Sequence, residues 1–140
     1  MKIASSIGCC LILLSLAFGE EPRSFAKIAV ASVHPRATEA GLEAARRGGN
    51  AVDAAIATAL TLGIVDGHNS GIGGGCFILI RTADGTISAI DGREMAPAKA
   101  HRDMYVIGGK LDEEASKTGA LASAVPGAIA AYDLALRKHG

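Results

Sequence analysis

Apolar residues gather in separate stretches of this chain, with glycine, proline and charged residues between them. The stretch at 26–33 (AKIAVASV) contains β-branched residues and ends before Pro35, which favours extended backbone in the residue that precedes it. We predict a strand there. Residues 38–47 contain strong helix formers and end at a glycine pair, which predicts a helix with one solvent-facing side.

The next stretch, residues 51–65, is apolar all round and rich in alanine. This pattern predicts a helix that is enclosed on every side. Asn50 precedes the stretch as an N-cap, and the carboxylate of Asp53 lies in the first turn, where free backbone amides favour a negative charge.

Two alternating apolar runs follow, FILIR at 77–81 and TISAID at 86–91. The Asp84-Gly85 pair between them is a strong signal for a β-hairpin. A glycine-rich segment at 71–75 leads into the first of these strands. Antiparallel strands are therefore expected after the buried helix.

The pattern is less regular after the hairpin. Residues 92–102 predict an irregular loop, residues 102–105 a short helical turn, and residues 108–117 a solvated stretch. Pro126 suits the first position of a last helix. The apolar side of that helix would carry Ile129, Tyr132, Leu134 and Leu136. The chain as a whole is predicted to be α/β, with helices and strands in layers (α+β).

The first residues are typical of an export signal. Lys2 supplies a positive start, residues 7–18 form an apolar run of signal-peptide length, and small residues fit cleavage after Gly19. The run is shorter than the ~20 residues that a membrane helix needs, and a retained signal anchor is the competing interpretation. We expect a signal peptide at 1–19, a mature segment at 20–140, and export to the periplasm or the extracellular space.

Composition narrows the class of protein. A chain of 140 residues is long enough for one domain at most, and 49% hydrophobic against 20% charged residues excludes a disordered chain. Lys plus Arg and Asp plus Glu are 14 each, so no net charge attracts nucleic acid, and we do not expect it as a partner. Signal cleavage would remove Cys9 and Cys10 and leave Cys76 without an intramolecular disulfide.

Anion binding at the 71–75 segment and nucleophilic catalysis by Cys76 are two candidate functions, and each feature also has a purely structural explanation. The backbone amides of the 71–75 segment could hold an anion, but phosphate loops open a helix, whereas this segment leads into a strand. Cys76 could be a nucleophile with His68 as its base, although a lone cysteine in an apolar strand is more often a small buried residue. Packing is the favoured interpretation for both.

Arg93 is the stronger candidate for a binding residue. It lies between Asp91 and Glu94 directly after a predicted strand, where a guanidinium can be held rigidly and offered to a carboxylate in bidentate fashion. An ion pair within the chain is the alternative. The histidines lack the spacing of a zinc site, and we expect neither a metal nor a cofactor. They are His34, His68, His101 and His139.

Several blocks of the sequence, taken in order, resemble the start of the gamma-glutamyltranspeptidase family. They are HPRAT at 34–38, GGNAVDA at 48–54, the glycine-rich segment, and REMAP at 93–97. The resemblance covers about 28–105, and SAVPG at 123–127 is similar to the next landmark of the family. Each block alone is weak, and their order makes the resemblance specific.

The resemblance implies an N-terminal nucleophile hydrolase with an αββα sandwich, of which only the N-terminal portion is present. Residues 20–140 would be a partial gamma-glutamyltranspeptidase-like domain at the start of the large subunit. Family precursors cleave themselves into a large and a small subunit and expose a threonine whose own amine serves as base. That threonine attacks the γ-glutamyl amide of glutathione or a related compound and passes the acyl group to an amino acid, a peptide or water.

The resemblance assigns Arg93 to the α-carboxylate of the γ-glutamyl substrate and assigns no catalytic residue to this chain. The family's nucleophile lies in a later portion, and Thr38 and Thr118 do not match its position. Cys76 stands where the family commonly has a small residue, which again favours packing. We therefore expect the chain alone to be inactive, with an uncovered sheet edge and an uncovered helix face that promote aggregation.

Other functions remain open at this level. The chain could be a non-catalytic exported remnant or a binding module. Within the same scaffold, it could also come from a relative that acts as a cephalosporin acylase or as a capsule depolymerase. The intact REMAP block at 93–97 favours a γ-glutamyl donor over these relatives.

Overall fold

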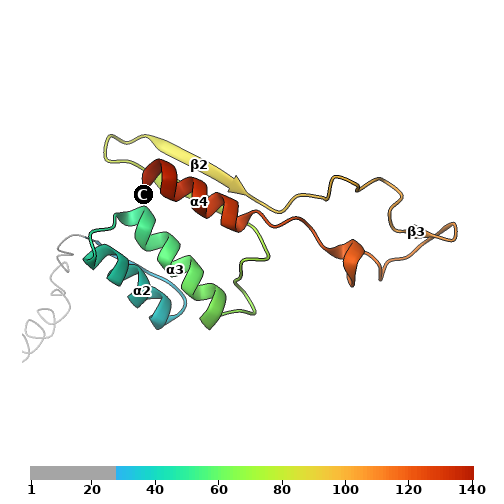
Figure 1. The fold of residues 1–140 in the computed structure, drawn as a ribbon, viewed down its shortest axis with the longest axis horizontal. Coiled ribbons are helices and arrows are strands. Elements are labelled where there is room, and N and C mark those ends of the chain that lie inside the picture. Colours follow the sequence, from blue (N-terminus) through green and yellow to red (C-terminus); the bar gives the residue numbers. More distant parts are fainter. Residues whose placement is uncertain (1–27) are drawn as a thin grey trace, which may run out of the picture.

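The computed structural model describes residues 28–140, so the signal peptide predicted at 1–19 lies outside the described residues. In chain order its elements are α2 (Pro35–Arg46), α3 (Ala51–Val65), β1 (Cys76–Arg81), β2 (Ile87–Gly92), β3 (Val106–Ile107), β4 (Lys110–Leu111), the 3-10 turn η1 (Ala120–Ala122) and α4 (Ala128–His139). The three helices and the β1–β2 hairpin form one body, and the segment between β2 and α4 extends away from it (Figure 1). Within the described part, no helix is long and apolar enough to cross a membrane.

Helix α2 begins three residues before the predicted start at residue 38. His34 caps it, because its Nδ1 accepts a hydrogen bond from the backbone N–H of Arg36 at 3.2 Å, and Pro35 occupies the first helical position. The backbones of α2 and α3 approach closely at Gly41, where a Cβ would lie 2.9 Å from the carbonyl oxygen of Ala54. The close approach explains why a glycine occupies this buried position.

Helix α3 has the predicted bounds and the predicted cap. The side chain of Asn50 accepts from Val52 N at 2.7 Å, and the carboxylate of Asp53 accepts from Asn50 N at 2.8 Å. The expectation that this helix is enclosed on every side is wrong, since Leu60 is 43% and Ile64 85% exposed. Helices α2 and α4, the inner face of the β1–β2 hairpin and the 28–33 segment each contact part of α3, and the remaining surface is open.

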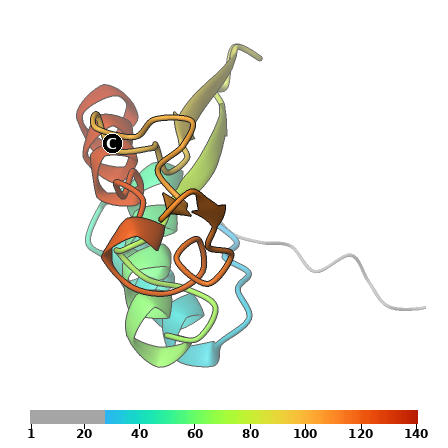
Figure 2. The ribbon, with the colours of Figure 1, turned by 90° about the vertical axis from the view of Figure 1, so that its right-hand side faces the viewer.

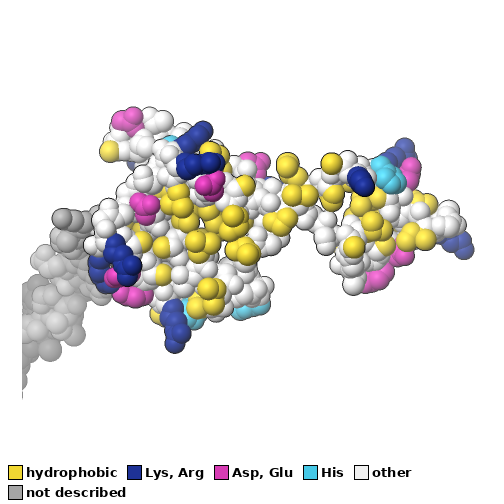
Figure 3. Space-filling view, in the orientation of Figure 1, with side chains coloured by type: hydrophobic (Ala, Val, Ile, Leu, Met, Phe, Trp, Pro, Cys, Tyr) yellow, Lys and Arg dark blue, Asp and Glu magenta, His cyan; other side chains and the backbone are white. Residues whose placement is uncertain are grey.

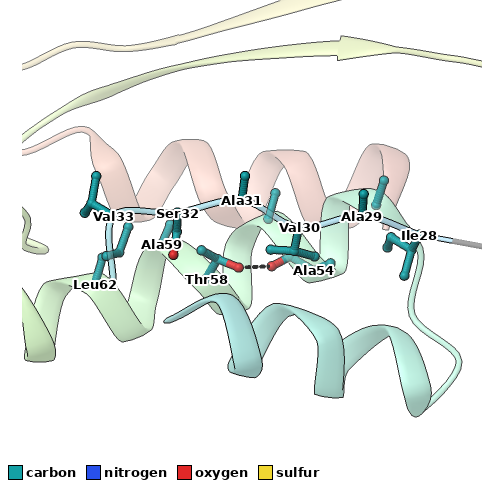
Figure 4. Close-up of a pocket in the computed structure, with 12 residues that line it drawn as sticks. Ile28, Ala29, Val30, Ala31, Ser32, Val33, Ala54, Thr58, Ala59 and Leu62 are labelled. Atoms are coloured by element: carbon teal, nitrogen blue, oxygen red, sulfur yellow. Dashed lines mark hydrogen bonds between the residues drawn. The ribbon is translucent and has the colours of Figure 1, made fainter. Parts of the chain in front are cut away.

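The predicted strand at 26–33 is wrong over residues 28–33, and residues 26–27 lie outside the described part. This segment runs along α3 without pairing to any described strand (Figure 4). Its side chains and those of Ala54, Thr58 and Leu62 line an apolar cavity. A strand needs a neighbouring strand to bond with, and the described residues supply none at this edge.

The hairpin is confirmed. Strands β1 and β2 pair antiparallel with Phe77 opposite Asp91. The predicted turn residues act as expected, because Gly85 has a φ of 89° and the carboxylate of Asp84 accepts from the N–H of Thr86 at 3.0 Å.

The two faces of the hairpin have different environments. Ile78, Ile80 and Ile90 face inward and pack around Ile56 of α3 and the alanines of α4. Figure 2 shows α4 against this face and no described element on the other. The outer face exposes Phe77, Leu79 and Ile87. Further hydrophobic side chains gather on the surface over α3 and α4 (Figure 3). The chain thus leaves apolar surface uncovered on more than one side, as expected of a partial domain.

The segment after β2 forms an extension whose ends are tied together. Met95 and Val125 exchange backbone hydrogen bonds of 3.1 and 2.8 Å, and an irregular path joins them. Residues 102–105 form the predicted turn. The predicted solvated stretch at 108–117 is confirmed, because all of its residues are exposed except Asp112 and Ala115, which are half-buried. Two of its residues, Lys110 and Leu111, form β4 and pair with β3.

The prediction that Pro126 begins the last helix is wrong. Helix α4 begins at Ala128, and Gly127 takes the N-cap position. The backbone N–H groups of both residues donate to the carbonyl oxygen of Gly74, at 3.1 Å from Gly127 and 3.2 Å from Ala128. This contact across the fold, rather than proline geometry, sets the start of the helix.

Candidate functional site

Arg93 lies directly after β2, as predicted, and its side chain is 71% exposed. Its backbone N–H donates to Asp91 Oδ1 at 2.9 Å, which holds the chain as it leaves the strand. Its Nε lies 3.4 Å from Oε2 of Glu94. None of the described residues pairs with its terminal Nη atoms, so the ion pair and a free guanidinium end coexist.

A cavity of about 470 Å³ has Arg93 in its lining. Arg93 and Glu94 line it on the side of the sheet, and Tyr105 and Leu121 line it on the side of the extension. The Tyr105 hydroxyl donates to the carbonyl oxygen of Leu121 at 3.3 Å and so ties the two limbs of the extension together. Arg93 therefore lies at a hollow that could admit a small anionic molecule.

A junction of three glycines, Gly75, Gly92 and Gly127, fixes the backbone at Arg93. A Cβ on Gly75 would lie 2.7 Å from the carbonyl oxygen of Gly92 and 2.9 Å from Arg93 Cα. A Cβ on Gly127 would lie 2.9 Å from the carbonyl oxygen of Arg93. These gaps are too short for a side chain, so the end of β2 is clamped between the glycine-rich segment and the start of α4.

The role of the glycine-rich segment at 71–75 follows from the same contacts. The carbonyl oxygen of Gly74 accepts from the first amides of α4, and Gly75 lies against the end of β2. The segment therefore packs the end of β2 against the start of α4, in agreement with the packing role that the sequence favours over anion binding. The sequence pattern did not point to Gly92 and Gly127 as packing positions. An isolated glycine at a strand end, such as Gly92, often marks a close backbone approach.

The structure does not assemble the candidate nucleophile pair. Both ring nitrogens of His68 have other neighbours, with Nδ1 3.3 Å from Asp66 Oδ1 and Nε2 3.0 Å from Asn69 Nδ2. Cys76 instead packs beside the hydrophobic core. Burial raises the pKa of its thiol, and the negative charge of Glu94 raises it further. A raised pKa leaves less thiolate at any given pH, which disfavours nucleophilic chemistry.

The same pKa shift gives a measurable prediction for Cys76. In the folded chain, its reaction with iodoacetamide at mildly alkaline pH is expected to be several-fold slower than in denaturant, because only the thiolate reacts. Peptide mass spectrometry would follow alkylation at Cys76 alone. A rate in the folded chain that equals or exceeds the rate in denaturant would contradict the packing role.

The hydroxyl groups of Thr38 and Thr118 make hydrogen-bond contacts only with residues near them in the sequence. Thr38 Oγ1 lies 2.8 Å from the hydroxyl of Ser32, and Thr118 donates to Glu114 Oε1 at 2.6 Å. Nothing in these contacts suggests catalysis. Among residues 28–140, no group of three or more His, Cys, Asp or Glu side chains is arranged to hold a metal ion.

Comparison with known proteins identifies the relatives of this chain. Residues 37–140 match the gamma-glutamyltranspeptidase family. The glutathione hydrolase proenzyme of Escherichia coli (strain K12) is 48% identical over 112 residues, which are 79% of this chain and 19% of that protein. Glutathione hydrolase 2 of Arabidopsis thaliana is 46% identical over 112 residues, 80% of this chain and 19% of that protein. The chain thus spans about a fifth of the length of these relatives.

The three-dimensional comparison agrees with the sequence comparison. The crystal structure of Helicobacter pylori gamma-glutamyltranspeptidase superposes with a TM-score of 0.78 at 37% identity, covering 86% of this chain and 35% of that one. The family match includes most of α2, all of α3, both strands of the hairpin, the block around Arg93 and α4. This chain therefore belongs to the gamma-glutamyltranspeptidase family, and its helices and small antiparallel sheets are part of that family's N-terminal nucleophile hydrolase fold.

Proposed function

We propose that this chain is the start of the large subunit of a γ-glutamyl acyltransferase or hydrolase that acts on glutathione and related γ-glutamyl compounds. The observation that carries the proposal is Arg93. It stands in the REMAP block of a family member, directly after β2, with an exposed side chain, and it contributes to the lining of a cavity. A guanidinium matches a carboxylate with two parallel hydrogen bonds, so Arg93 would bind and orient the α-carboxylate of the donor.

In this proposal the chain contributes binding and orientation, and the covalent chemistry belongs to a later portion of the protein. A threonine hydroxyl there attacks the γ-glutamyl carbonyl, and its own amine takes the hydroxyl proton and passes it to the departing amine. The amide C–N bond breaks, and the glutamyl group stays on the threonine as an ester. Water or the amine of an amino acid or peptide then attacks the acyl-enzyme and releases the glutamyl group. Arg93 acts in both steps by holding the α-carboxylate, and hence the γ-carbonyl, in place.

The uncovered surfaces support the proposal that a larger fold completes this chain. The outer face of the β1–β2 hairpin is apolar and exposed, and the 28–33 segment has no described strand beside it. A second sheet and further strands of an αββα sandwich would cover both. The small subunit from the same precursor would be the partner that supplies part of this cover.

We also propose that the protein is exported, with a signal peptide at 1–19 and a mature chain in the periplasm or outside the cell. The positive start, the apolar run and the small residues before Glu20 support this. Mass spectrometry of the secreted fraction would find a mature N-terminus at Glu20.

The experiment that tests the proposed function begins with the transcript. Sequencing past the codon for Gly140 would show whether the frame continues to a threonine at a plausible self-cleavage point. The complete product is then assayed for glutamate release from glutathione, with a variant of that threonine to alanine as control. Cleavage and release that both disappear in the control would support the proposal. A stop after Gly140 and an inactive product would instead make the chain a non-catalytic remnant.

A further inference from the structure

Asp91 has no part in the proposed function as stated so far, although its side chain is bonded to the backbone of Arg93. We propose that Asp91 is a positioning residue for Arg93, because its carboxylate fixes the backbone from which the guanidinium extends. This inference rests on the proposed function of Arg93 as the residue that binds the donor α-carboxylate.

Strand pairing stops just before Arg93. The register of β1 with β2 ends at Gly92, and the next backbone pairing along the chain is the exchange between Met95 and Val125. Among the described residues, the hydrogen bond that the Arg93 backbone makes is the one from its N–H to Asp91 Oδ1, at 2.9 Å. A side chain thus supplies the bond that a neighbouring strand would otherwise supply.

Gly92, the residue between Asp91 and Arg93, explains why this bond matters. It is buried, and a Cβ there would lie 2.6 Å from the Cβ of Ala131, so the position requires a glycine. Glycine restricts its own φ and ψ less than any other residue, so the peptide that follows it is free to turn unless another contact holds it. The carboxylate of Asp91 closes an Asx turn across Gly92 and fixes the direction of the Arg93 N–H.

Asp91 acts on Arg93 through the backbone and not through the guanidinium. Both side chains are exposed while Gly92 between them is buried, which is the alternation expected of residues two apart on an extended chain. Within the described part, the guanidinium forms an ion pair with Glu94 and none with Asp91. The position of the acceptor oxygen of Asp91, rather than its charge, is therefore the property that matters.

A fixed backbone favours a bidentate pair. Two parallel hydrogen bonds form only when the guanidinium fork and the carboxylate are aligned with each other. A backbone that turns at Gly92 would spread the guanidinium over several directions, and the donor would have to order it on binding. Asp91 removes this cost, so its effect should appear in KM rather than in kcat.

The chain contains a second turn of this kind that serves as a control. Asp112 Oδ1 accepts from the N–H groups of Glu114 and Ala115, both at 3.0 Å. Asp112 follows β4 in the extension and does not line the cavity to which Arg93 contributes. Asp112→Ala therefore removes bonds of the same kind without changing the backbone next to Arg93.

The test measures kcat and KM for glutathione in the complete protein that carries this chain. Asp91→Ala should raise KM roughly three- to tenfold, the range expected of one hydrogen bond, with kcat within about twofold. Asp91→Asn keeps the Oδ1 acceptor and loses the charge, so its KM should change by less than about twofold. Asp91→Glu keeps the charge but is one methylene too long for the turn, so KM should rise as in Asp91→Ala. Asp112→Ala should leave both constants unchanged.

The asparagine and glutamate variants separate geometry from charge. A raised KM in Asp91→Asn together with an unchanged KM in Asp91→Glu would show that the charge matters and would overturn the inference. Thermal unfolding of each variant shows whether it is folded, and Asp91→Glu carries the test if Asp91→Ala does not fold.

A double-variant cycle separates positioning from an independent role. If Asp91 acts through Arg93, the double variant Asp91→Ala, Arg93→Ala should match Arg93→Ala alone. Effects that multiply, or an unchanged KM in Asp91→Ala and Asp91→Glu, would overturn the inference while leaving the proposed function intact. If Arg93→Ala itself has no effect, the assignment of Arg93 fails, and this inference fails with it. Calorimetric binding of glutathione gives the same cycle as Kd values when turnover is too slow to measure, and absence of binding would overturn both.

Discussion

Replacing Arg93 with alanine in the complete protein is expected to raise KM for glutathione about 10- to 100-fold. The variant would lose a bidentate, charge-assisted pair with the donor α-carboxylate, which is worth ~1.5–3 kcal/mol, and each ~1.4 kcal/mol is a factor of ten. In the proposed function the covalent chemistry belongs to a later portion of the protein, so kcat should fall much less than kcat/KM. Initial rates of glutamate release over a range of glutathione concentrations would measure both constants.

Arg93→Lys tests whether the geometry of the guanidinium matters in addition to its charge. Lysine keeps the charge but cannot reproduce the planar fork, so KM should still rise several-fold. Arg47→Lys is the matched control, because Arg47 is an exposed arginine on the surface beside α2 whose Nε also pairs with a glutamate. An unchanged KM with either substitution at Arg93 would place the α-carboxylate at another residue.

Replacing Gly127 with alanine is expected to lower the free energy of unfolding by roughly 1–3 kcal/mol, the usual cost of overpacking. The added Cβ would lie 2.8 Å from the carbonyl carbon of Gly92 and 2.9 Å from the carbonyl oxygen of Arg93. Both are backbone atoms, so no side chain can move aside. The end of β2 or the start of α4 must shift instead. Denaturant titration of the complete protein would measure the loss.

Gly73→Ala is the control for this effect. Gly73 lies in the same glycine-rich segment and has no positive φ, and a Cβ at this position would have no neighbouring atom within 4 Å. Its replacement should change stability by less than about 0.5 kcal/mol. Equal effects of Gly73→Ala and Gly127→Ala would show that the three-glycine junction is not tight. A rise in KM in a folded Gly127→Ala variant would further link the junction to the placement of Arg93.

Features that depend on near neighbours in the sequence were predicted well. The capping box of α3 joins Asn50 and Asp53, which are three residues apart. The turn of the hairpin depends on Asp84 and Gly85 themselves. The position of Arg93 directly after a strand followed from the alternating run before it. In the first two cases, the interacting groups lie within one turn of helix or one hairpin loop.

Features that depend on distant partners were predicted poorly. The 28–33 segment has strand composition but no described strand to pair with. Helix α3 has the composition of a buried helix, yet Ile64 remains 85% exposed because the described elements cover only part of it. The start of α4 depends on Gly74, whose carbonyl oxygen accepts from Ala128 far along the chain. Composition cannot show whether such a partner is present.

The candidate site also combines features that the sequence predicts with features that only the folded structure shows. Residue type and order within REMAP, together with the resemblance, select Arg93 as the candidate and predict a carboxylate as its ligand. Only the folded chain brings Gly75 and Gly127 against the backbone at Arg93 and lays the carboxylate of Glu94 on the glycine-rich segment. The order of residues within a short stretch determines which chemical groups are present there and which short-range hydrogen bonds can form. The close approach of backbones that are distant in sequence depends on packing, which no short stretch of sequence specifies by itself.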